Sequence, residues 1–130
     1  MMNSQPIVVE SQNVVAIDDD ELSLELIRRH LRKTPHTLSV FLSAEKALEY
    51  LAFNSPSVLI VDHRMPRMEG LDVLSSLDEQ RRLKGVRVYL CSAVALPASV
   101  QEAASKLGAT AMLKDTLSQR HHFLEATELL

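Results

Sequence analysis

The stretch VLIVDHRMPRMEG, residues 58–70, puts four apolar residues directly before Asp62 and follows them with a short polar loop. A short apolar run bounded by turn residues is typical of a strand that is buried on both faces, as in a parallel sheet. Parallel sheets bind ligands in the crevice beyond the carboxyl ends of their strands. Because Asp62 stands at such an end, we expect it to face a functional crevice.

The run at 58–61 is one of five apolar runs in the chain, and stretches with helical periodicity follow each of them. Short strands that alternate with longer helices predict an α/β fold, a doubly wound five-stranded parallel sheet flanked by five helices. A chain of 130 residues has room for one such domain. The expected strands are 13–17, 37–41, 58–61, 86–90 and 110–113, and the expected helices are 20–33, 43–53, 71–84, 97–107 and 116–128.

The domain is expected to span residues 12–130, since no repeat, low-complexity tract or Pro/Gly/Ser linker interrupts the alternation. Residues 1–11 are predicted to form a flexible N-terminal arm. The segment IVVE, residues 7–10, leaves two alternatives open: it packs on an edge strand or a partner, or it belongs to a disordered leader.

The composition excludes several classes of protein. Hydrophobic residues make up 46% of the chain and charged residues 24%, which is ordinary globular usage. With a net charge of −3 and scattered Lys and Arg residues, the chain lacks a basic field, so we expect no direct nucleic-acid binding. Cys91 is the single cysteine and cannot form an internal disulfide. No apolar run reaches the roughly 20 residues that span a bilayer, and no signal peptide is recognisable, so we expect a cytoplasmic protein without membrane contact.

Polar side chains follow four of the five expected strands. Carboxylates gathered at one sheet edge repel one another and lose solvation, and a divalent cation with oxygen ligands offsets this cost. Mg²⁺ fits such a site best, with Mn²⁺ as the alternative. A nearby lysine and hydroxyl would stabilise a phosphoryl group transferred to a carboxylate. The side chains concerned are Asp18, Asp19 and Asp20 after the first strand, Asp62 after the third, Ser92 after the fourth and Lys114 after the fifth.

Helix capping is the alternative explanation for the three consecutive aspartates, because negative charge stabilises a helix N-terminus. One aspartate suffices for a cap, and Asp20 alone supplies it. The polar residues at the other strand ends therefore favour a binding role for Asp18 and Asp19.

Four segments resemble, in order and spacing, the motifs of bacterial response-regulator receiver domains: VVAIDDDELS (14–23), VLIVDHRMPRMEGLDVL (58–74), LCSA (90–93) and AMLKD (111–115). The resemblance implies a flavodoxin-like sheet with strand order 2-1-3-4-5 and a place in a two-component phosphorelay. Gly70 would allow a turn that a Cβ would strain. The roles implied are Asp62 as phosphoacceptor, Asp18, Asp19, Asp62 and the backbone carbonyl of Arg64 as metal ligands, Ser92 as the switch hydroxyl and Lys114 as its partner at the phosphoryl group.

The same resemblance implies that the chain works with partner proteins. A sensor histidine kinase or a histidine phosphotransfer protein would donate the phosphoryl group, and a downstream output domain or protein would read the result. A homodimer through the face of the fourth helix, fifth strand and fifth helix is a further option. Such a domain is not an enzyme, although it assists its own phosphotransfer and slow dephosphorylation.

Two positions depart from the family pattern. Asp115 stands where a cis proline usually follows the lysine, and because a cis bond without proline costs about 2.5–4 kcal/mol, we expect a trans bond or a reshaped loop. Ala111 stands where the family usually has an aromatic switch residue. The switch is therefore expected to act through the backbone and the fourth helix.

Two alternative functions remain. A phosphorylation-independent receiver-like protein-binding module would keep the fold and lose the chemistry. An aspartate-nucleophile phosphatase is disfavoured, because Arg64 stands where its D-x-D motif needs a second acid. The histidines His63, His121 and His122 are interpreted as incidental surface residues.

Overall fold

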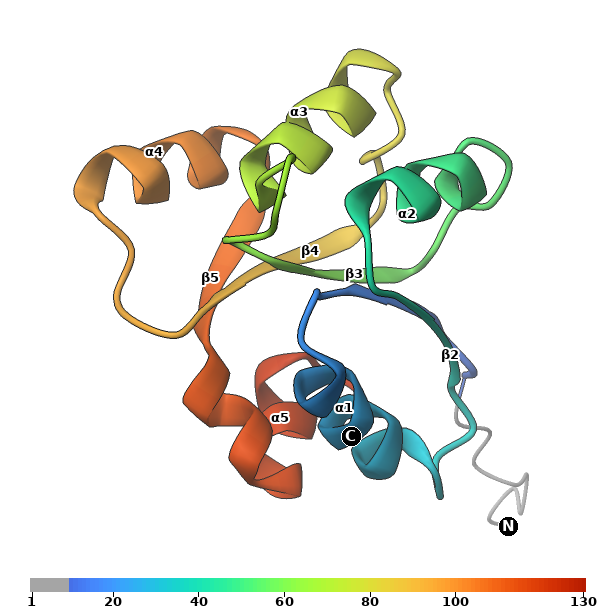
Figure 1. Ribbon diagram of the computed structural model, residues 1–130. Coiled ribbons are helices and arrows are strands. Elements are labelled where there is room, and N and C mark those ends of the chain that lie inside the picture. Colours follow the sequence, from blue (N-terminus) through green and yellow to red (C-terminus); the bar gives the residue numbers. More distant parts are fainter. Residues whose placement is uncertain (1–9) are drawn as a thin grey trace, which may run out of the picture.

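The computed structural model describes residues 10–130, and in this part of the chain five strands form a single parallel sheet. The strand order is β2-β1-β3-β4-β5, which confirms the predicted fold class and topology. β2 and β5 form the two edges of the sheet (Figure 1). The strands are β1 (Asn13–Ile17), β2 (Thr37–Phe41), β3 (Val58–Asp62), β4 (Arg87–Ser92) and β5 (Ala109–Leu113).

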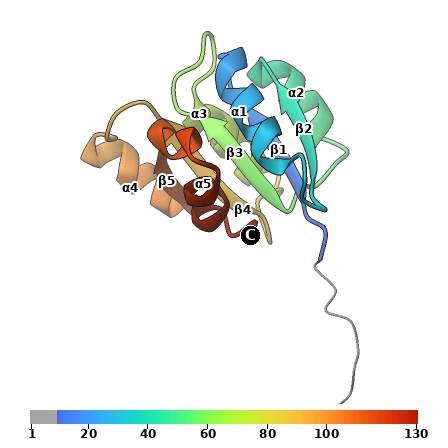
Figure 2. The same cartoon turned by 90° about the horizontal axis from the view of Figure 1, so that it is seen from below.

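Helices cover both faces of this sheet. Figures 1 and 2 show α1 and α5 together on one face, with α2, α3 and α4 on the other. Two helices begin at an N-cap side chain: that of Asp20, the cap predicted from the sequence, accepts from the N–H of Leu22, and that of Ser43 accepts from the N–H of Lys46. The helices are α1 (Glu21–Leu31), α2 (Ala44–Leu51), α3 (Gly70–Glu79), α4 (Ala98–Lys106) and α5 (Arg120–Ala126), with a short 3₁₀ helix, η1 (Lys114–Ser118).

The apolar runs of the inner strands β1, β3 and β4 are buried on both sides because successive strand residues point to opposite faces. Val14 and Ile60 belong to the core beneath α1 and α5, together with Phe123. Val61 belongs to the second core, beneath α2, α3 and α4, together with Leu74. Both faces of the inner strands are thus occupied, and polar side chains can gather only beyond the strand ends.

Two helix boundaries differ from the sequence prediction by more than two residues. The third helix ends at Glu79 rather than near Gly85, because Arg81 adopts a positive φ of 56° and the N–H of Arg82 bonds the carbonyl of Leu77. This pair of features is a C-terminal capping motif built on a non-glycine residue. A continuous helix over 116–128 was also wrong, since the extended backbone of Gln119 separates η1 from α5.

The predicted arm lies largely outside the described residues, which begin at residue 10. At Gln12 the chain is already joined to the domain, since its N–H donates to Nδ1 of His36 and its carbonyl accepts from Thr37. The boundary at residue 12 stays a prediction. None of the helices formed by residues 10–130 has the length and apolar character needed to cross a bilayer.

Candidate functional site

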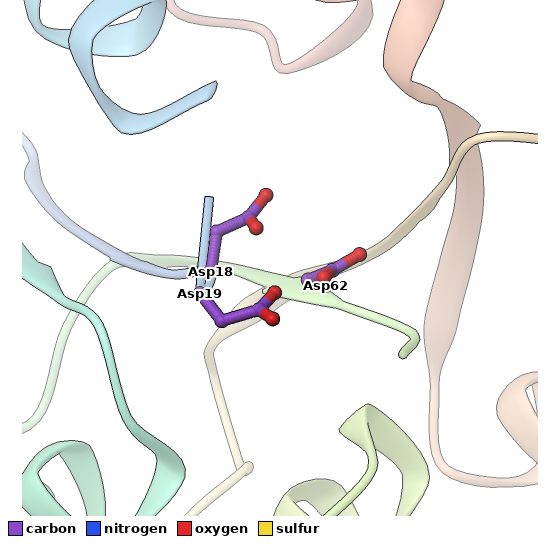
Figure 3. Close-up of side chains that lie close together, drawn as sticks. All are labelled: Asp18, Asp19 and Asp62. Atoms are coloured by element: carbon purple, nitrogen blue, oxygen red, sulfur yellow. The ribbon is translucent and has the colours of Figure 1, made fainter. Parts of the chain in front are cut away.

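Three aspartates meet at the carboxyl ends of the adjacent strands β1 and β3. Asp18 and Asp19 directly follow β1, and Asp62 ends β3. Because Ile17 pairs with Val61 in the parallel register, the next residues, Asp18 and Asp62, lie side by side. One oxygen from each carboxylate lies within 4.8 Å of the others, and Figure 3 shows the three side chains gathered at these strand ends. The sequence correctly placed these carboxylates at one edge of the sheet.

Asp20, the third consecutive aspartate, has a separate role. Its side chain accepts hydrogen bonds from the N–H of Leu22 and the hydroxyl of Ser23, so it caps α1. Its own N–H donates to Oδ1 of Asp18 at 2.9 Å, which fixes the orientation of that carboxylate. The capping explanation therefore holds for Asp20, while Asp18 and Asp19 belong to the cluster.

Lys114 joins the acidic cluster from the end of β5. Its Nζ lies 3.1 Å from Oδ2 of Asp18 and 3.2 Å from Oδ1 of Asp62. No peptide bond among residues 10–130 is cis, and the chain after Lys114 turns directly into η1. The expected trans bond is confirmed, and the loop still delivers the lysine to both carboxylates.

Ser92 lies at the end of β4 and is buried, but its hydroxyl is engaged elsewhere. The Oγ atom donates to the carbonyl oxygen of Val94, two residues further along the chain, at 2.5 Å. Arg64 lies in the loop after β3 with its side chain exposed. Ser92 is thus near the acidic cluster but held by its own β4–α4 loop.

A cavity of about 370 Å³ opens from the acidic cluster toward this loop. It combines charged groups at one end with apolar side chains at the other. All of the predicted site residues except Asp18 line it. The lining residues are Asp19, Asp62, His63, Arg64, Ser92, Ala93, Val94, Ala95, Leu96, Pro97 and Lys114.

Burial and charge shift two ionisable groups of the site. Burial, together with the neighbouring charge of Asp18, raises the pKa of Asp62 from 3.8 to about 7, although Lys114 opposes this. Burial alone would lower the pKa of Lys114, but its hydrogen bond and charge interaction with Asp18, and the charge of Asp62, raise it. The lysine therefore stays charged, whereas the carboxylates are not fully compensated and still favour an added cation.

The raised pKa of Asp62 predicts a pH dependence of stability. The folded chain binds this proton more tightly than the unfolded chain, so its contribution is complete below the ordinary pKa and is lost as pH rises through about 7. In metal-free protein we expect the free energy of unfolding to fall between about pH 4 and pH 7, and Asp62→Asn to reduce this fall. Urea unfolding at several pH values, with a chelator present, measures both. An equal pH slope in the two proteins would contradict the assignment.

Glycine is required at position 70 because other atoms lie close to its Cα, and not because of its own backbone angles. A Cβ at this position would lie 2.4 Å from the carbonyl oxygen of Asp62 and 2.7 Å from a methyl group of Leu90. The predicted strain from a Cβ therefore comes from this contact, since the φ of Gly70 is not among the positive values of the described residues. Contact between the start of α3 and the end of β3 is the reason.

His63 was misplaced by the sequence interpretation. Its side chain is only 8% exposed, and its Nδ1 is buried without a hydrogen-bond partner among the described residues. His63 lies just beyond the end of β3, yet its N–H still donates to the carbonyl of Cys91 and holds it against β4. His121 and His122, by contrast, are exposed on α5 as predicted.

The structure defines a doubly wound α/β domain with an aspartate cluster and a lysine beyond its strand ends. The chain belongs to the response regulator receiver domain family, whose model matches residues 14–125. The predicted family is thereby confirmed.

Relatives and solved structures agree with this assignment. The two-component response regulator ORR3 of Oryza sativa is 29% identical over 101 residues, which is 77% of each chain. The sensory/regulatory protein RpfC of Xanthomonas campestris is 32% identical over 81% of this chain, but the match covers 15% of that protein. Chemotaxis protein CheY4 of Vibrio cholerae superposes with a TM-score of 0.81 at 18% identity, covering 92% of this chain and 98% of that one. The receiver domain of the putative response regulator NarL of Mycobacterium tuberculosis reaches 0.70 at 29% identity, covering 91% and 94%.

Proposed function

We propose that this receiver domain accepts a phosphoryl group on Asp62 in a two-component phosphorelay. The observation that carries the proposal is the convergence of Asp18, Asp19 and Asp62 with the Nζ of Lys114 at 3.1–3.2 Å from two of them. A buried carboxylate between a cation site and a lysine suits nucleophilic attack on phosphorus, because both neighbours stabilise charge on the transferred oxygens.

A carboxylate oxygen of Asp62 would attack the phosphorus atom, and the bond from phosphorus to the donor's nitrogen or oxygen would break with its electron pair. Asp18, Asp19, Asp62 and the backbone carbonyl of Arg64 would hold Mg²⁺, or alternatively Mn²⁺. Three converging carboxylate oxygens and no thiol or imidazole ligand fit a hard cation. The bound ion supplies positive charge to the phosphoryl oxygens.

Lys114 and Ser92 would act after transfer. Lys114 already contacts Asp18 and Asp62, and would redirect its charge toward the new phosphoryl group. Ser92 would have to leave the carbonyl of Val94 before its hydroxyl could donate to a phosphoryl oxygen. That exchange would couple the phosphorylated site to the β4–α4 loop and bias an existing two-state equilibrium.

The proposed donors are a sensor histidine kinase or a histidine phosphotransfer protein, and a downstream output domain or protein is the proposed reader. The α4-β5-α5 face is the proposed surface for that reader or for a homodimer, since Leu113 and Ala111 are exposed on β5. A cytoplasmic location stays a prediction.

Labelling by acetyl phosphate tests the proposal. We expect the wild-type protein to gain one phosphoryl group in Mg²⁺, to gain none with a chelator, and to lose all labelling in Asp62→Ala, as measured by intact-protein mass spectrometry. The departures at Ala111 and Asp115 motivate one alternative, a phosphorylation-independent binding module. A folded wild-type protein that is never labelled would favour that alternative.

A further inference from the structure

The imidazole of His63 has a buried nitrogen, Nδ1, that makes no hydrogen bond with the described residues. The side chain is 8% exposed, and Nδ1 has no hydrogen-bond partner among residues 10–130. A buried donor or acceptor without a partner is costly, and nearly all such atoms in folded proteins are paired. An alternative conformation that pairs this nitrogen would therefore gain stability relative to the observed one.

The sheet register places His63 next to Ser92. Asp62 pairs with Cys91 across β3 and β4, so the following residues, His63 and Ser92, are neighbours where the two strands end. The backbone of His63 is fixed on both sides, with its N–H bonded to Cys91 at 2.7 Å and its carbonyl to Gly70 at 3.0 Å. A partner must therefore come to the imidazole, since the backbone of His63 is held in place.

The β4–α4 loop contains the complementary group. Val94 has an exposed side chain, 73% accessible, and its carbonyl accepts the hydroxyl of Ser92. His63, Ser92 and Val94 all line the cavity of about 370 Å³. If Ser92 turned toward a phosphoryl group, the carbonyl of Val94 would lose its donor in the cavity that His63, with its unpaired Nδ1, also lines.

We infer that His63 is a positioning residue for the switch: its Nδ1–H takes over the carbonyl of Val94 when Ser92 releases it, and so stabilises the rearranged β4–α4 loop. The inference rests on the proposed function of Asp62 and Ser92. It requires no change in the charge of the imidazole, since a neutral ring can carry its hydrogen on Nδ1. It also supplies a coupling element in a chain whose residue 111 is alanine.

Beryllium fluoride, which mimics a phosphoryl group on a carboxylate, tests this inference without turnover. His63→Leu removes the unpaired atom from the resting state and the new hydrogen bond from the switched state. Both changes favour the resting state, so we expect affinity for beryllium fluoride in Mg²⁺ to fall about tenfold, the size of one hydrogen bond's coupling. The amide NMR shifts of residues 93–96 on binding should become smaller.

Two further variants separate a switch role from a structural one. His63→Asn would place a side-chain amide N–H near the position of Nδ1, so this variant should retain affinity and loop shifts. His122→Leu makes the leucine substitution on the exposed face of α5 and should change neither. Affinity for Mg²⁺ alone should be unchanged throughout, because the resting site does not use the imidazole.

The beryllium fluoride experiment tests the proposed function of Asp62 and the role of His63 separately. A wild-type protein that fails to bind beryllium fluoride in Mg²⁺ would overturn the proposed function itself. If the wild type binds it and His63→Leu binds equally well with the same loop shifts, the proposed function stands and the role of His63 is refuted. Loss of affinity in both His63→Leu and His63→Asn would also refute it, because the hydrogen bond would then not be the cause.

Discussion

Gly70→Ala is expected to destabilise the fold by about 2–3 kcal/mol, within the range for inserting atoms into a well-packed core. The new Cβ would lie 2.4 Å from the carbonyl oxygen of Asp62, which is main chain and cannot rotate away. Relief of this contact must move the start of α3 or the end of β3. We therefore also expect weaker Mg²⁺ binding, because the carboxylate of Asp62 moves with its backbone.

Gly85→Ala is the matched control for this prediction. Gly85 has a φ of +78°, and a Cβ there would meet nothing within 4 Å. Alanine at Gly85 should cost about 1–2 kcal/mol through its left-handed backbone alone and should leave Mg²⁺ affinity intact. Urea unfolding and Mg²⁺ titration measure the two effects. Equal metal affinity in Gly70→Ala and wild type would show that this contact does not position the site.

The second large effect concerns two adjacent aspartates: we expect one substitution to weaken metal binding and the other to lower the stability of the fold. Asp19→Ala should weaken Mg²⁺ binding by about 100-fold, since loss of a residue that only supports a metal ligand already costs about 10–100-fold and Asp19 is proposed as a direct ligand. Its stability should hardly change, since its side chain is exposed and holds no cap. Asp20→Ala should instead cost about 1 kcal/mol of stability, because it removes the bond to the N–H of Leu22.

Titration of Mg²⁺ by isothermal calorimetry and urea unfolding of both variants give the comparison. Asp20→Ala should retain most of its metal affinity, because its carboxylate is turned toward α1. Similar losses of affinity in the two variants would contradict the division of roles. That result would mean that both aspartates attract Mg²⁺ by their negative charge alone, and that Asp19 is not a specific metal ligand.

Much of this architecture follows from local sequence. Apolar runs of four or five residues predicted every strand, and the polar residues that follow four of these runs predicted which side chains meet, because parallel strands end at one edge. Asp18, Asp62 and Lys114 converge for this reason, although they are far apart in the chain. Caps at Asp20 and Ser43 were predictable from their side-chain chemistry.

The missed features depend on tertiary structure. Arg81 ends α3 in a left-handed conformation, which sequence patterns assign to glycine, so Gly85 was preferred as the stop. His63 is polar and follows the apolar run, but the register with β4 keeps it buried. The turn of the Ser92 hydroxyl toward Val94 is a side-chain rotation that no residue pattern specifies.

The identity of the phosphorylated residue is the most direct test of the central claim. Borohydride reduces an aspartyl phosphate to homoserine, so mass spectrometry of peptides from protein treated with acetyl phosphate and Mg²⁺ locates the acceptor. The account predicts homoserine at position 62, with none at Asp18 or Asp19 and none in a sample treated with chelator. Homoserine at Asp18 or Asp19 instead, or phosphorylated protein that yields no homoserine, would contradict it.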